Sequence, residues 1–225
     1  MNSSPSTWKG GLEANIYNIQ IVYYCVFSES VAQRVLKAVE ASPSGIASLD
    51  VLESLGLCGP ATLRVTLSRL GRGGRIVRLK RGTYSASPIR DAFASAQAVF
   101  NGYIGLSSAL YLHRLISEVP FTVTVVTARK SGAKRVGGYE FRAVALGGKA
   151  VGFERKGPYV VSTRAKTLFD CLYLPKYAVE PEKLISAFRE ARLGKEERLE
   201  FLGYVEKFAS AKARTRILKA AKQVW

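Results

Sequence analysis

A cluster of polar and basic side chains early in the chain has the residue types that bind nucleic acid. Arginine and lysine neutralise phosphates, arginine can also donate two hydrogen bonds to guanine, and serine or threonine can bond to either group. Every charged side chain between positions 60 and 84 is a lysine or an arginine. The candidate contacts to double-stranded DNA are Thr62, Arg64, Thr66, Ser68, Arg69, Arg72, Arg75, Arg78, Lys80 and Arg81.

A helix is predicted to present the first members of this set. Pro60 suits the first position of a helix, and Leu63, Leu67 and Leu70 recur at helical spacing, which predicts one buried stripe. The other positions form two outward strips, one with Thr62, Thr66 and Arg69 and the other with Arg64, Ser68 and Arg72. Arg69 is expected to read a base edge.

A basic β-hairpin is predicted directly after this helix. Residues 75–80 alternate charged and apolar side chains with period two, and residues 83–85 return as the second strand. The turn between them contains Gly82, which tolerates positive φ. Lys80 and Arg81 are expected to contact phosphates whatever the DNA sequence.

Two further helices are predicted to support this pair of elements. One covers residues 29–41 with Ser28 as its cap, and a short one follows Ser48, with its apolar side formed by Val51, Leu52 and Leu55. Three helices followed by a basic hairpin are typical of a winged helix-turn-helix, which is predicted for residues 28–87. Such a domain reads repeated half-sites, so a dimer or cooperative binding on the operator is expected.

Composition restricts the class of partner. The formal net charge of the 225-residue chain is +17, which favours a polyanion. Residues 16–27 form an apolar run that is too short to span a membrane and lacks the features of a signal peptide, so no membrane partner and a cytoplasmic location are expected. Three scattered cysteines and one histidine suggest no metal site, and no cofactor is expected.

The chain is predicted to have an α+β fold with two domains after an unassigned extension. The extension, residues 1–27, could close the core of the first domain or pack on a partner. The boundary is placed at residues 85–88, and because each half has its own apolar stripes, each is expected to fold alone. Residues 88–225 form the second domain.

Within the second domain, helices are predicted at residues 89–99, after Ser107, after Thr163, and in the C-terminal segment. Strands are predicted at residues 121–127, 139–146, 151–153 and 159–162. The basic, glycine-rich residues 129–138 are expected to form a loop.

Two titratable residues of this domain could be mistaken for catalytic groups. His113 stands alone among leucines and tyrosines, which is typical of a hydrogen-bonded packing residue. Asp170 lies within an apolar helical pattern, so a buried salt bridge or a cap is expected, and Arg142 and Arg164 are the candidate partners.

An enzyme is the competing class. Glu140 and Glu154, the latter within a Glu-Arg-Lys sequence, could belong to a nuclease-like module. The surrounding basic residues would repel a divalent cation, and the chain has no Walker-type or dinucleotide-binding glycine motif. No catalytic activity is therefore predicted, and a stand-alone DNA- or RNA-binding regulator remains the alternative.

The second half also resembles a known family. The sequence YIGLSSALYLHRL at residues 103–115 and the sequence TRAKTLFD at residues 163–170 are similar to those of the AbiEi-type antitoxins, which are transcriptional regulators of abortive-infection toxin–antitoxin systems. The motif positions are Tyr103, Ser107, Ser108, Leu110, His113 and Asp170. The resemblance implies an autorepressing winged helix joined to a domain that counteracts a co-encoded nucleotidyltransferase toxin, through the toxin itself or through its RNA substrate.

Overall fold

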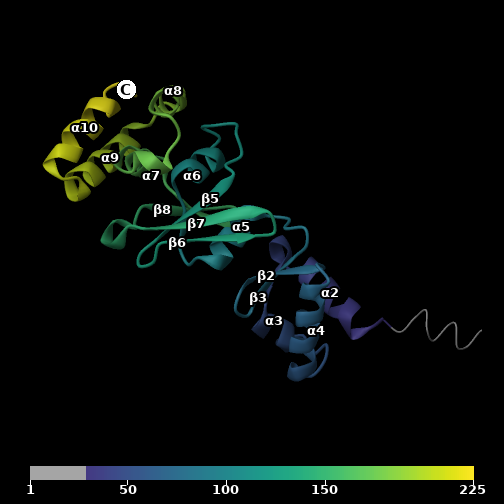
Figure 1. Cartoon of the computed structure of the whole chain (residues 1–225). Helices are drawn as coiled ribbons and strands as arrows, with labels where there is room; N and C mark the ends of the chain where they lie inside the picture. The colour runs from purple at the N-terminus through teal and green to yellow at the C-terminus, as the bar shows by residue number, and fades with distance from the viewer. Residues whose placement is uncertain (1–28) are drawn as a thin grey trace, which may run out of the picture.

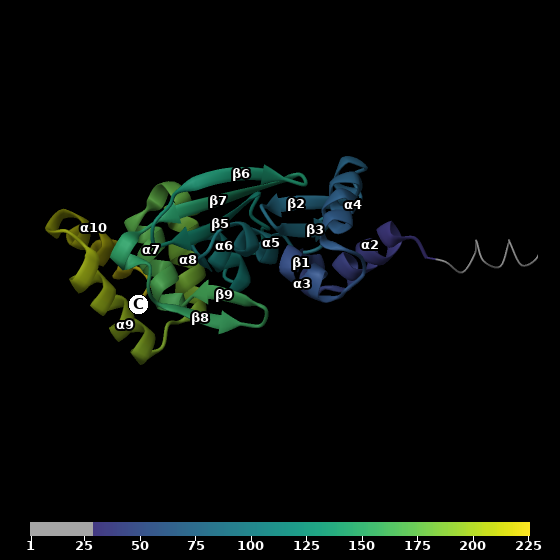
Figure 2. The same ribbon diagram turned by 90° about the horizontal axis from the view of Figure 1, so that it is seen from below.

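A computed structural model describes residues 29–225 (Figure 1). The predictions for residues 1–27 and for Ser28 lie outside this part of the chain. The molecule is elongated, with a small helical unit at one end, a large sheet in the middle and a group of helices at the other end (Figures 1 and 2). Helices and strands are mixed in both halves, so the fold is α+β.

The first unit packs helices on a small antiparallel sheet with strand order β1-β3-β2. Its elements are α2 (Val31–Ala41), β1 (Ile46–Ser48), α3 (Leu49–Ser54), α4 (Pro60–Arg72), β2 (Ile76–Lys80) and β3 (Thr83–Ala86), with a 3-10 turn at Pro43–Gly45. Ser30, and not Ser28, caps α2, because its side chain accepts from the Gln33 amide while the Gln33 side chain returns to the Ser30 amide. Strand β1, which periodicity did not indicate, pairs along its whole length with residues 83–85 of β3.

The core of this unit confirms the helical spacing of α4. Leu63 and Leu67 are fully buried, together with Val35 and Val39 of α2 and Leu52 of α3. The predicted apolar side of α3 was too wide, because Val51 and Leu55 are about half exposed. A helix of six residues can bury only a narrow face against its neighbours.

The second unit is built on a mixed sheet with strand order β6-β7-β5-β4-β9-β8. Its strands are β4 (Tyr103–Ile104), β5 (Thr122–Thr127), β6 (Gly132–Val136), β7 (Tyr139–Ala145), β8 (Phe153–Lys156) and β9 (Tyr159–Ser162). The predicted loop at residues 129–138 was wrong in its second half, because β6 pairs antiparallel with β7 across a turn at Gly137 and Gly138. The strand predicted at residues 151–153 lies instead at Phe153–Lys156.

Helices cover both faces of this sheet. They are α5 (Ala92–Val99), α6 (Leu106–Leu112), α7 (Arg164–Tyr173), α8 (Pro181–Ala191), α9 (Lys195–Phe208) and α10 (Ala211–Ala221), with 3-10 turns at Gly147–Lys149 and Pro175–Tyr177. α5 packs on the face that carries Val125 and Phe141, whereas α6 and α7 pack on the face that carries Val126 and Val144. Gly105, and not Ser107, occupies the cap position of α6. No helix within residues 29–225 is long and apolar enough to cross a membrane.

A hydrophobic cluster connects the two units across the predicted boundary. Leu79 of β2 is completely buried, and its cluster contains Ile89, Ala96 of α5, and Val125 and Phe141 of the large sheet. The Lys134 ammonium of β6 also donates to the Leu79 carbonyl. The two units thus share this cluster in addition to the separate core of each, because alternation along β2 directs Leu79 away from the first unit's helices.

Candidate nucleic-acid interface

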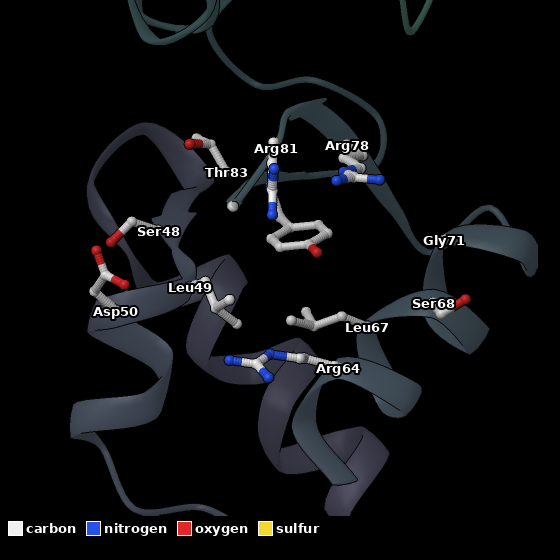
Figure 3. A pocket seen from close by; sticks show the side chains of 12 residues that line it. Ser48, Leu49, Asp50, Arg64, Leu67, Ser68, Gly71, Arg78, Arg81 and Thr83 are labelled. Carbon is white, nitrogen blue, oxygen red and sulfur yellow. The ribbon is translucent and has the colours of Figure 1, made fainter. Parts of the chain in front are cut away.

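Helix α4 presents the basic side chains because its sequence leaves only one face apolar. Pro60 occupies the first turn after Gly59, and the buried leucines at positions 63 and 67 attach the helix to the core. Arg64 and Ser68 lie on the side that faces the β2–β3 hairpin (Figure 3). Arg69 and Arg72 lie in the last turn, where a positive charge is favourable at the negative end of the helix dipole.

The hairpin is short and is held against the start of α3. Its strands pair Arg78 with Tyr84 and Lys80 with Thr83, and the turn uses Gly82 at φ 73°. The Leu49 amide donates to the Gly82 carbonyl at 2.7 Å, so the turn is tied to the first residue of α3. This hydrogen bond therefore holds the backbone that bears the hairpin arginines in place.

A cleft of about 920 Å³ separates α4 from the hairpin (Figure 3). Arg64 and Ser68 line it from α4, and Arg78 and Arg81 line it from the hairpin. The remaining lining residues are Ser48, Leu49, Asp50, Leu67, Gly71, Gly82, Thr83 and Tyr84. The charged lining residues are thus three arginines and one aspartate, Asp50, so the lining of the cleft has a net positive charge.

One of these arginines is engaged by a carboxylate. A nitrogen of Arg64 lies 3.2 Å from an oxygen of Glu53, and the Arg64 side chain is 64% exposed. An ion pair in such contact with water contributes at most about 1 kcal/mol. A phosphate or a guanine edge can therefore replace Glu53 at little cost.

The structure separates the predicted contacts into groups. Arg64, Ser68, Arg78 and Arg81 line the cleft. Exposed outside the cleft are Thr62, Arg69, Arg72, Arg75 and Lys80. Thr66 was assigned to an outward strip, and this was wrong: only 9% of it is exposed, because it lies next to Leu63 and Leu67 on the buried stripe.

The cleft also contains residues that were not predicted as contacts. Ser48 and Asp50 come from the start of α3, and Thr83 and Tyr84 come from the returning strand. Their position depends on the bond between Leu49 and Gly82, which joins residues distant in the chain, so no local pattern indicated it. Ser48 was predicted as a cap, and its hydroxyl does accept from the Val51 amide at 3.2 Å.

The motif positions of the second unit are mostly buried. Tyr103, Ser108, Leu110 and Asp170 have almost no exposed surface. Ser108 has a clear structural role, because its hydroxyl accepts from the Thr124 amide at 2.9 Å and so attaches α6 to β5. Among the motif positions, Ser107 alone lines one of the clefts described in residues 29–225.

His113 is a hydrogen-bonded packing residue, as predicted. Its Nε2 atom lies 2.7 Å from the Ser162 carbonyl, to which it donates, and its Nδ1 atom lies 3.2 Å from the ammonium of Lys156, from which it accepts. Burial lowers the pKa of His113, and the Lys156 charge lowers it further. The imidazole ring is therefore neutral, and each of its nitrogens forms a hydrogen bond.

Asp170 does form a buried salt bridge, but its predicted partner was wrong. The carboxylate lies 2.5 Å from the ammonium of Lys166, one helical turn earlier, and both side chains are completely buried. Arg142 instead pairs with Glu140 at 2.6 Å, and Arg164 pairs with Glu197 at 3.4 Å. Burial raises the pKa of Asp170 to about 6, although Lys166 opposes this, and burial lowers the pKa of Lys166.

Glu140 and Glu154, the two candidate nuclease residues, lie far apart in the sheet. Glu140 lies on β7 and Glu154 on β8, which are four strand spacings apart in the sheet, or about 19 Å. Glu140 is engaged by Arg142 and Arg135, and the hydrogen bond from Arg142 lowers its pKa. Within residues 29–225, no three His, Cys, Asp or Glu side chains are grouped so that they could hold a metal ion.

Comparison with known proteins adds no relative. Neither a protein-family model nor a curated protein matches the chain. The likeness to AbiEi-type antitoxins therefore rests on the two motif segments at residues 103–115 and 163–170.

Proposed function

We propose that the first unit is a winged helix-turn-helix and that the protein is a cytoplasmic, DNA-binding transcriptional regulator. The order of its elements is compatible with this fold, since α3 and α4 are followed by the β2–β3 hairpin. The observation that carries the proposal is the convergence of Arg64, Arg78 and Arg81 on one cleft from two elements. Guanidinium groups in such an arrangement suit phosphate and base edges.

A duplex fits this surface in a specific way. α4 has 13 residues and is therefore about 20 Å long, and a helix of this size enters the major groove of B-form DNA. With α4 in the groove, Arg64 and Ser68 reach base edges, and the hairpin carries Arg78 and Arg81 to the flanking phosphates. The deep, narrow major groove of A-form RNA does not admit a helix, which favours DNA over double-stranded RNA.

The hairpin arginines provide the test of this proposal. A plot of the logarithm of the DNA-association constant against the logarithm of salt concentration has a negative slope. Replacing both Arg78 and Arg81 by alanine should make this slope shallower by about two, because two phosphate contacts are lost. Affinity for cognate and random duplexes should fall in parallel. Fluorescence anisotropy with labelled duplexes over a range of salt concentrations measures both quantities.

Arg155→Ala is the matched control, since Arg155 is an exposed arginine on β8 of the second unit and does not line the cleft. This control should leave the salt slope unchanged. If the double variant also retained the wild-type slope, the cleft would not be the DNA interface. Arg64→Ala should instead reduce the preference for the cognate site, at a cost of about 1–3 kcal/mol.

The resemblance supports a second, more specific proposal, namely that the regulator is also an antitoxin. Repression would use the cleft of the first unit, whereas protection from a nucleotidyltransferase toxin would use the second unit. The Arg78→Ala and Arg81→Ala double variant should therefore still rescue cells that express the neighbouring toxin gene, although it no longer represses a reporter under its own operator. Loss of both activities together, with normal protein levels, would contradict this division of labour.

A further inference from the structure

A second cleft, of about 350 Å³, lies on the α6 face of the large sheet. It is lined by Ser107 of α6, by Thr122 of β5 and Arg142 of β7, by residues between Ile116 and Phe121, by residues 176–179, and by Lys183 of α8. This face is the opposite one from that on which α5 and the first unit pack. The cleft is thus separate from the proposed DNA interface.

The cleft carries more positive than negative charge. Arg142, Lys176 and Lys183 line it, and Glu118 is the single carboxylate among its lining residues. Lys183 pairs with Glu118, and Arg142 is oriented by Glu140 at 2.6 Å. Lys176 forms no ion pair with another described residue, so its ammonium is available to an anion.

Two aromatic residues, Phe121 and Tyr177, also line this cleft. Phe121 is 98% exposed, which is unusual for a phenylalanine, and it belongs to the wall of the cleft. The ring of Tyr177 lies inside the cleft, with the Lys176 ammonium 4.6 Å and the Arg142 guanidinium 5.9 Å from its centroid. An exposed ring and cations that line one cleft can bind a nucleotide together, the ring stacking on the base and the cations holding the phosphate.

We infer that this cleft binds one ribonucleotide, either free or as a unit of single-stranded RNA. Lys176 and Arg142 bind the phosphate, Phe121 stacks on the base, and the hydroxyl of Ser107 is available to the ribose 2′-hydroxyl, whereas the Thr122 hydroxyl donates to Glu140 at 3.5 Å. An acidic peptide would use the cations but would leave the face of Phe121 without a partner. The volume also lies at the lower end of the range for small-molecule sites.

The test is isothermal titration of the full chain with AMP, with UMP, and with adenosine and inorganic phosphate as half-ligands. AMP and UMP should bind, each half-ligand should bind more weakly, and dAMP should bind more weakly than AMP. Phe121→Ala should weaken AMP binding about tenfold or more, because stacking of one base contributes about 1–3 kcal/mol. Leu199→Ala, which removes another exposed apolar side chain, 61% exposed, from α9, is the matched control and should have no effect.

Lys176→Ala should weaken AMP but not adenosine, which separates the phosphate contact from stacking. A uridine hexaribonucleotide, titrated into the Arg78→Ala and Arg81→Ala double variant, distinguishes RNA from a free nucleotide, since that background removes binding at the first cleft. Tighter binding of the hexamer than of UMP assigns the cleft to RNA, and equal binding assigns it to the free nucleotide. No binding of either, binding unchanged by Phe121→Ala, or binding of a glutamate hexapeptide alone would overturn the inference without affecting the DNA proposal.

Discussion

Replacing Lys166 by methionine should reduce the free energy of unfolding by about 3–5 kcal/mol at neutral pH. The change removes the ammonium that compensates Asp170, and neither side chain has any exposed surface. The second oxygen of the Asp170 carboxylate already has no hydrogen-bond partner among the described residues. In the variant, Asp170 must either stay charged without a partner or take up a proton, and the free-energy cost of this is the main cause of the large effect.

A double variant separates loss of the pair from loss of one partner. Lys166→Met combined with Asp170→Leu should recover most of the stability, because well-packed apolar side chains of similar volume often replace a buried ion pair without cost. The ring faces of Tyr103, Phe169 and Tyr204 lie within 6.0 Å of the Lys166 ammonium and offer an apolar environment to methionine. Urea unfolding followed by circular dichroism measures both variants. A double variant less stable than the single one would show that the pair itself stabilises the fold.

The effect of Lys166→Met should depend on pH in a defined direction. Asp170 has a folded-state pKa of about 6, above its usual value of 3.8, so the stability it contributes is present at low pH and is lost as pH rises through 6. Removal of the Lys166 charge raises this pKa further. The destabilisation relative to the wild type should therefore be larger at pH 8 than at pH 5, and a deficit independent of pH would contradict this assignment.

Leu79→Ala should destabilise the whole chain by about 2–5 kcal/mol, the usual range for a leucine truncated in a core. Leu79 is in the hairpin strand of the first unit, yet the side chains around it include Ile89, Val125 and Phe141 beyond the boundary. The cavity would consequently weaken both units, and unfolding monitored in either half should shift together. Urea titration with a probe in each unit checks this.

Leu55→Ala is the matched control, because Leu55 lies in the first unit but is 52% exposed, and the change should have little effect. A fragment that ends at residue 87 provides a second readout. It lacks the residues that cover Leu79, so it should unfold at a lower urea concentration than the first unit within the full chain. Equal midpoints for the fragment and the full chain would show that the cluster is not a shared core.

The sequence by itself determined the elements whose geometry depends on near neighbours. Pro60 and the spacing of Leu63 and Leu67 were sufficient to place α4, and Gly82 was sufficient to place the hairpin turn. Helical periodicity, a fixed proline φ and the tolerance of glycine for positive φ all act within a few residues. The candidate DNA surface was therefore largely predictable, and the spacing of Lys166 and Asp170, one helical turn apart, could also have indicated their pairing.

Tertiary structure alone decided which faces are covered by distant parts of the chain. Thr66 is buried because the covered face of α4 is wider than its leucines define, and residues 132–136 form a strand because they pair with β7. Leu79 belongs to a core shared with the second unit. Ser107, Arg142 and Lys176, which are distant in sequence, line one cleft only in the folded chain. Burial and charge at these positions depend on contacts between residues far apart in sequence, and such contacts leave no signal in local spacing.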